Sequence, residues 1–157
     1  MFFAVNSCKK HETYPIEPII EYNSFVKIEN GTGIDNKGFL IINFTDGDGD
    51  IGLEAEDTLP PYNINGPFYY NFFIEYYELQ NDSFVFVELP FTFNARIPKV
   101  KDDLAEQGIK GEIRIEVYFN NLGSQSDSIK FKASIVDRAL HRSNEIMTPS
   151  IFVKKTP

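Results

Sequence analysis

The feature that most constrains the fold of this chain is a two-residue alternation of apolar and polar side chains. Ile113, Ile115, Val117 and Phe119, for example, alternate with charged residues and a tyrosine. Successive side chains of a β-strand point to opposite faces of a sheet, so this pattern is typical of a strand with one buried face. The same alternation recurs at residues 40–44, 70–76 and 129–135. The chain is therefore predicted to consist mainly of half-buried β-strands.

About seven such strands are predicted, separated by turns rich in asparagine and glycine. Pro90 interrupts the fourth, which suits an edge strand that bends between sheets. The one helix expected is short, at residues 101–107, and ends at Gly108. The expected strands are residues 19–28, 38–44, 68–79, 84–97, 112–119, 128–137 and 149–155.

The number and length of these strands favour an all-β fold, specifically an immunoglobulin-like antiparallel β-sandwich. A small barrel is the alternative. The length of 157 residues is typical of a single domain with one hydrophobic core. Residues 19–157 are expected to form that domain.

Charge excludes one large class of function. The formal net charge is −8, and no run of lysine or arginine exceeds the pairs Lys9-Lys10 and Lys154-Lys155. Nucleic-acid binding needs a basic stripe, so it is not expected. No apolar run approaches the roughly 18 residues of a membrane-spanning helix. Cations or basic surfaces are the better-matched partners.

The run from Asp46 to Gly52 places three aspartates in alternate positions, with glycine between them. Oxygen-rich loops of this kind bind Ca²⁺, which takes about six to eight oxygen ligands. Two departures from a regular twelve-residue calcium loop are Ile51, where glycine is usual, and a final Asp in place of Glu. Counted from the first aspartate, the candidate ligands are Asp46, Asp48, Asp50, the Gly52 carbonyl, Glu54 and Asp57.

The competing interpretation is that these aspartates and glycines only form tight turns at a solvated acidic tip. In an immunoglobulin-like sandwich, the second and sixth strands run in the same direction, so the loops that follow them lie at the same end. That arrangement brings Asp137 to the acidic loop, with the connection between Pro98 and Gly111 beside it. Asp137 is either a further ligand or the partner of Arg138 or Arg142 in a salt bridge.

Cys8 cannot form an internal disulfide, because it is the only cysteine. The residues before it, Val5-Asn6-Ser7, resemble a bacterial lipobox, with an aliphatic residue three positions before the cysteine and a small residue next to it. Lipid attachment at Cys8 is therefore expected. Residues 1–18 would then be the remnant of a lipoprotein signal followed by a tether. The alternative is an ordinary exposed thiol.

The acidic run, with Phe44-Thr45 before it, resembles a signature of small Bacteroidota-type lipoproteins whose exported domains have immunoglobulin-like folds. Residues 135–149 resemble the last hairpin of the same families. The resemblance covers these segments and the lipobox. It implies a lipid-anchored envelope protein, with the outer membrane as the expected location and no assigned activity.

Catalysis is not expected, because the chain has only two histidines and lacks a nucleophile elbow or a phosphate-binding glycine loop. The main prediction is a non-enzymatic interaction module that binds an envelope protein. A carbohydrate-binding module is the alternative, because tyrosine rings stack on sugar faces. The tyrosines placed for it are Tyr62 in a loop and Tyr69 and Tyr77 on the polar strand face.

Overall fold

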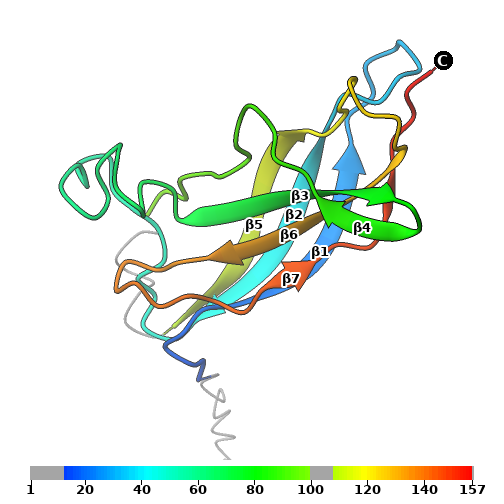
Figure 1. Ribbon diagram of the computed structural model, residues 1–157. Helices are drawn as coiled ribbons and strands as arrows, with labels where there is room; N and C mark the ends of the chain where they lie inside the picture. Colours follow the sequence, from blue (N-terminus) through cyan, green and yellow to red (C-terminus); the bar gives the residue numbers. More distant parts are fainter. Residues whose placement is uncertain (1–12, 100–107, 157) are drawn as a thin grey trace, which may run out of the picture.

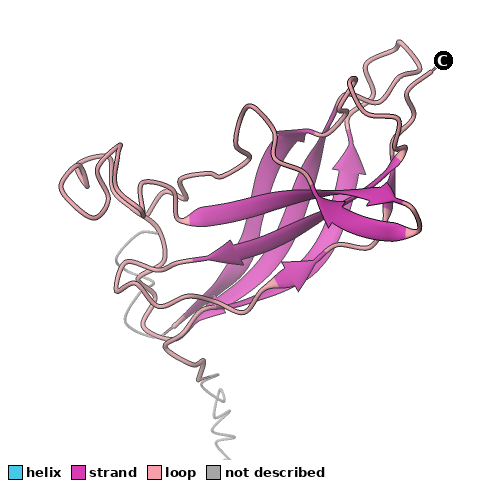
Figure 2. Ribbon diagram, viewed as in Figure 1, coloured by secondary structure: helices cyan, strands magenta, loops and turns pink. Residues whose placement is uncertain are grey.

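The computed structural model describes residues 13–99 and 108–156, and these form two antiparallel β-sheets packed face to face (Figure 1). Figure 2 shows only strands and loops in the described part of the chain. The all-β sandwich prediction is thus confirmed, while the predicted helix at residues 101–107 lies outside the described residues. The strands are β1 (Ile19–Lys27), β2 (Lys37–Asp46), β3 (Phe72–Gln80), β4 (Ser83–Phe86), β5 (Ile109–Tyr118), β6 (Ser128–Ile135), β7 (Ile146–Met147) and β8 (Ile151–Phe152).

The strand order is that of an immunoglobulin-like sandwich. One sheet has the order β1-β2-β5, and the other has the order β4-β3-β6-β7, with β8 also paired to β6. These positions correspond to strands A, B and E facing strands C′, C, F and G. Within the described residues, no helix is long and apolar enough to cross a membrane.

The alternating apolar residues meet between the two sheets, as the sequence pattern predicts. Leu40 and Ile42 of β2 and Ile129 and Phe131 of β6 are each 0% exposed. The Phe131 ring lies within 5.9 Å, centroid to centroid, of the rings of Phe25, Tyr76 and Phe93. Burial of these side chains is the main stabilising contribution to the fold.

Three predicted strands differ clearly from the observed ones. The third begins at Phe72 rather than at residue 68, so Tyr69 lies in the loop before β3 and not on a strand face. The fourth ends at Phe86 rather than at residue 97, and the segment after it bows away from β3 before Ala95 bridges back to Phe72. The last is β8, Ile151–Phe152, which is shorter than the predicted residues 149–155, and β7 precedes it outside the predicted range. Thr148 lies between β7 and β8, and its hydroxyl accepts a hydrogen bond from the Phe131 amide. At the fourth and last strands, side-chain hydrogen bonds or a proline replace ladder bonds, which alternation alone does not reveal.

Strand direction brings four chain segments to one end of the sandwich. Asp46, at the end of β2, pairs with Ile109 at the start of β5, and Ile135, at the end of β6, pairs with Phe72 at the start of β3. The loops that follow β2 and β6 therefore meet at this end (Figure 1).

Candidate metal centre

Four aspartate carboxylates converge at this end of the sandwich. Asp46 is the last residue of β2, Asp48 and Asp50 follow in the turn, and Asp137 comes from the loop after β6. One oxygen from each lies within 4.8 Å of the others. Asp46 and Asp137 are 0% and 1% exposed, so the cluster is partly inside the protein. We refer to these four residues as the aspartate cluster.

Backbone amides hold one oxygen of each buried or half-buried carboxylate. The Ile51 amide donates to Asp46 Oδ2 at 3.0 Å, and the Ala139 amide donates to Asp50 Oδ2 at 2.9 Å. The other oxygens of these two carboxylates, Asp46 Oδ1 and Asp50 Oδ1, are buried without a hydrogen-bond partner. Buried polar atoms normally have a partner, and a bound ion is one reason for an exception.

Asp137 is fixed by its own loop. The His141 amide donates to Asp137 Oδ1 at 2.7 Å, and His141 Nδ1 lies 2.9 Å from Asp137 Oδ2. The carboxylate at position 137 raises the pKa of His141 above its ordinary value through this hydrogen bond and its charge. The predicted proximity of Asp137 to the acidic loop is confirmed. Its partner is His141 rather than Arg138 or Arg142.

Mutual repulsion and burial change the protonation of the cluster. Burial, followed by the hydrogen bond and charge of Asp48 and then the charge of Asp50, raises the pKa of Asp46 to about 7. Burial also raises the pKa of Asp50, and the charge of Asp137 raises it further. In the absence of a cation, the cluster therefore retains a proton on Asp46 near neutral pH.

Close backbone packing explains the glycines of this loop. Gly52 has a φ of +98°, and a Cβ there would meet the Pro98 backbone. A Cβ at Gly47 would meet the backbone of Tyr14 and Pro15, and the Gly47 amide donates to the Pro15 carbonyl at 2.8 Å. Glycine is needed at such positions because it lacks a side chain. The acidic loop thus packs closely against Tyr14 and Pro15 at Gly47, and against Pro98 at Gly52.

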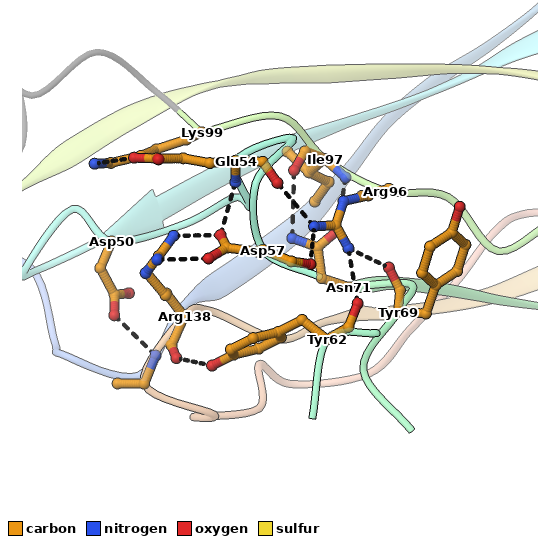
Figure 3. A network of polar contacts seen from close by, with 11 residues as sticks. Asp50, Glu54, Asp57, Tyr62, Tyr69, Asn71, Arg96, Ile97, Lys99 and Arg138 are labelled. Carbon is orange, nitrogen blue, oxygen red and sulfur yellow. Dashed lines mark hydrogen bonds and ion pairs between the residues drawn. The ribbon is translucent and has the colours of Figure 1, made fainter. Parts of the chain in front are cut away.

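The second half of the predicted twelve-residue loop has a different environment (Figure 3). Glu54 pairs with Lys99 at 2.8 Å. Arg138 binds Asp57 through two hydrogen bonds, at 2.5 and 2.7 Å. These two carboxylates are therefore in ion pairs, and the carboxylates that converge are those of the aspartate cluster.

Arg96 organises this second region, and the sequence analysis did not identify it. Its guanidinium donates to four backbone carbonyls, those of Glu54, Asp57, Tyr62 and Tyr69, at 2.8 to 3.4 Å (Figure 3). It lies between loop residues and the sandwich body. No local sequence pattern marks it, because its partners are 27 to 42 residues away along the chain.

The three tyrosines predicted for sugar binding are half-buried and engaged with the protein. The Tyr62 hydroxyl donates to the Arg138 carbonyl. Tyr69 packs edge-on against Tyr70 at 4.9 Å and lies beneath Arg96. Tyr77 packs against Phe86, and its hydroxyl donates to Glu75 at 2.7 Å. The ring contacts of Tyr69 and Tyr77 are thus with other aromatic residues of the protein. Cys8 lies outside the described residues.

Comparisons of this chain with known protein families, with curated proteins and with solved structures found no match. What the structure itself shows is an all-β sandwich with an aspartate cluster that could hold a metal ion.

Proposed function

We propose that this protein is a non-enzymatic, calcium-binding interaction module of the bacterial cell envelope. The observation that carries the proposal is the aspartate cluster, in which Asp46 is fully buried and its Oδ1 atom has no hydrogen-bond partner. A cation would satisfy that oxygen and offset the repulsion among the carboxylates.

The set of four carboxylate ligands favours Ca²⁺ among the common hard cations. Oxygens on opposite sides of Ca²⁺ are about 4.6 to 5.2 Å apart, since each bond is about 2.3 to 2.6 Å long. The four carboxylate oxygens, all within 4.8 Å of one another, are close enough together to contact one such ion. Mg²⁺ binds at about 2.0 to 2.1 Å and usually keeps several waters, so a set of four protein carboxylates suits it less well.

Calorimetric titration of Ca²⁺ into the purified, chelator-treated protein tests the proposal. We expect weak binding, with a dissociation constant of about 10⁻⁴ to 10⁻³ M, as in extracellular modules. Asp50→Asn should abolish the binding heat. Asp82→Asn is the matched control, because Asp82 is exposed in the turn between β3 and β4, at the other end of the sandwich. Absence of calcium heat, with an unchanged melting temperature in chelator, would refute calcium binding.

The cellular part of the proposal is lipid attachment at Cys8, supported by the lipobox residues Val5-Asn6-Ser7. A short tether would then hold the sandwich near the membrane. Mass spectrometry of the protein produced in a bacterial host, with a lipoprotein signal peptide placed before Val5, provides the test. We expect a diacylglycerol mass increment on Cys8 and its loss in Cys8→Ser. An unmodified Cys8 in soluble protein would contradict the anchor without affecting the calcium proposal.

Binding of an envelope protein is the role we propose for the folded domain, and glycan binding is the second candidate. The half-exposed pair Tyr69 and Tyr70 is the feature that favours a glycan. Their edge-on packing gives less flat aromatic surface than sugar stacking uses.

A further inference from the structure

A groove opens at the edge of the second sheet, away from the aspartate cluster. β4 ends at Phe86, and the next residue, Val87, still donates its amide to the Tyr76 carbonyl at 2.9 Å. The chain then returns to β3 where Ala95 bridges to Phe72. Between these points, residues 88–94 bow outward and leave a groove of about 420 Å³ beside residues 74–76 of β3. The Asn94 side chain, rather than a strand, accepts the hydrogen bond from the Ile74 amide, at 2.8 Å.

Aromatic rings form the walls of this groove, and packing against core residues holds them in place. Phe86 and Phe91 line it and are 51% and 52% exposed, whereas the neighbouring Phe93 is only 9% exposed. Phe91 packs edge-on against Phe93 at 5.2 Å, and Phe93 packs against Tyr76 and Phe131 in the core. The exposed rings therefore have a defined position, and binding would cost little ordering of the walls.

Two carboxylates lie in the same groove. Glu75 is paired with Lys132 at 3.1 Å and accepts a hydrogen bond from Tyr77. Glu88 is exposed, and within the described part of the chain it has no ion-pair partner. Lys130 of β6 lies over the Phe84 ring at 4.4 Å. An unneutralised carboxylate beside exposed aromatic rings is an environment that attracts a cationic side chain.

We propose that this groove binds an extended segment of a partner protein that carries a lysine or arginine next to an apolar side chain. The apolar side chain would pack against Phe86 and Phe91, and the cation would lie at Glu88. The net charge of −8 favours the approach of such a basic segment. The site is separate from the aspartate cluster, so binding does not require calcium.

Nuclear magnetic resonance titration of the ¹⁵N-labelled protein with a short Gly-Lys-Phe-Lys-Gly peptide, in EDTA, tests the proposal. We expect chemical-shift changes at residues 74–76 and 86–94, and no such changes with Gly-Glu-Phe-Glu-Gly. Glu88→Gln should weaken binding about threefold, as expected for an exposed ion pair. Phe91→Ala should weaken it about tenfold, through loss of aromatic contact. Raising the salt concentration should also weaken it.

Matched variants distinguish binding in the groove from non-specific binding elsewhere on the surface. Phe152→Ala removes a ring that is 58% exposed outside the groove, and Glu29→Gln removes an exposed charge elsewhere. Both should bind the lysine peptide as the wild type does. Equal binding of the glutamate peptide, shift changes outside the groove, or no change at millimolar lysine peptide would overturn the proposal. Groove binding by a glucose oligomer, but not by the lysine peptide, would overturn it in favour of a glycan. Because EDTA is present throughout, failure here is distinct from failure of calcium binding.

Discussion

Two groups of carboxylates lie at the same end of the sandwich, and they differ in how their charge is balanced. In the aspartate cluster, four carboxylates face one another, and burial raises the pKa of Asp46 to about 7. Next to it, Asp57 binds the Arg138 guanidinium through both of its oxygens. Partial burial acts to raise the pKa of Asp57, but the Glu54 amide and Arg138 more than offset it, and the pKa lies below its ordinary value.

The difference shows that sequence spacing does not define a metal site by itself. Apart from Asp137, which comes from the loop after β6, both groups belong to one acidic stretch of twelve residues, 46–57. Lys99 and Arg138, from distant segments, neutralise Glu54 and Asp57 in its second half. The Asp46 and Asp50 carboxylates of the first half instead accept hydrogen bonds from backbone amides. Arg138 connects the two, because its amide donates to the Asp50 carbonyl at 3.3 Å while its side chain binds Asp57. The unbalanced group is the one that can accept a cation.

Removing Arg96 should have the largest effect, because its guanidinium holds the loop that contains the paired carboxylates Glu54 and Asp57, which we call the neutralised region. In Arg96→Ala, four backbone carbonyls lose their shared donor. We expect the free energy of unfolding to fall by about 3 kcal/mol. Urea denaturation measures this change.

Arg114→Ala is the control for this experiment. Arg114 is an exposed arginine of β5 that lies over the Phe39 ring at 4.3 Å and has no role in the loops. Its removal should cost less than about 1 kcal/mol. Equal losses for the two variants would contradict the special role assigned to Arg96.

Lowering the pH should stabilise the aspartate cluster while it destabilises the neutralised region. The folded protein keeps a proton on Asp46 up to about pH 7, whereas the unfolded chain releases it near pH 4. The contribution of Asp46 to stability therefore falls as pH rises from about 4 to about 7. Between about pH 5.5 and about pH 7.5, the change should be about 2 kcal/mol in EDTA.

Asp46→Asn isolates this effect, because asparagine has no proton to release. The difference in unfolding free energy between wild type and Asp46→Asn, measured by urea denaturation in EDTA, should depend on pH in that window. Asp57 has the opposite sign, since its lowered pKa contributes stability that is lost only below about pH 4. A pH-independent difference for Asp46→Asn would disprove the proton assignment.

The fold was largely predictable because its signal is local. Alternation along β2, β5 and β6 is a property of adjacent residues, and it fixed both the strands and their buried faces. Strand direction in a sandwich then placed Asp137 beside the acidic loop. The predicted start of the third strand was wrong, because residues 68–71 belong to a loop. The limits of the fourth and last strands were also wrong, because they depend on side-chain bonds to Asn94 and Thr148.

The candidate site was only partly predictable because charge balance is not local. Glu54 and Asp57 have suitable spacing for calcium, but their partners Lys99 and Arg138 are 45 and 81 residues away. Nothing near them in the sequence indicates those pairs. The buried, unpartnered oxygens of Asp46 and Asp50 are likewise visible only when the loops after β2 and β6 are brought together.

Bound calcium should neutralise the carboxylate charge of the aspartate cluster, so that the charges of both regions are balanced. At about 5 mM Ca²⁺, a site with a dissociation constant of about 10⁻⁴ to 10⁻³ M raises the unfolding free energy by about 1.5 kcal/mol. Thermal or urea unfolding with calcium and with EDTA measures the gain. Asp46→Asn should lose it, and Asp82→Asn should retain it. A gain of equal size in Asp46→Asn would place the ion elsewhere.

The smallest effect is expected when an aspartate is replaced by asparagine in each of the two regions. Asp57→Asn removes one partner of a partly exposed ion pair, with side-chain exposures of 36% for Arg138 and 14% for Asp57, so we expect a loss of about 1 kcal/mol. Asp50→Asn in EDTA should instead be neutral or slightly stabilising, since it removes one repelling charge while its amide oxygen can still accept from Ala139. Paired urea denaturation curves at neutral pH decide the outcome. If both variants lose the same stability, the aspartate cluster is balanced by interactions within the protein, and the structural reason for a bound cation disappears.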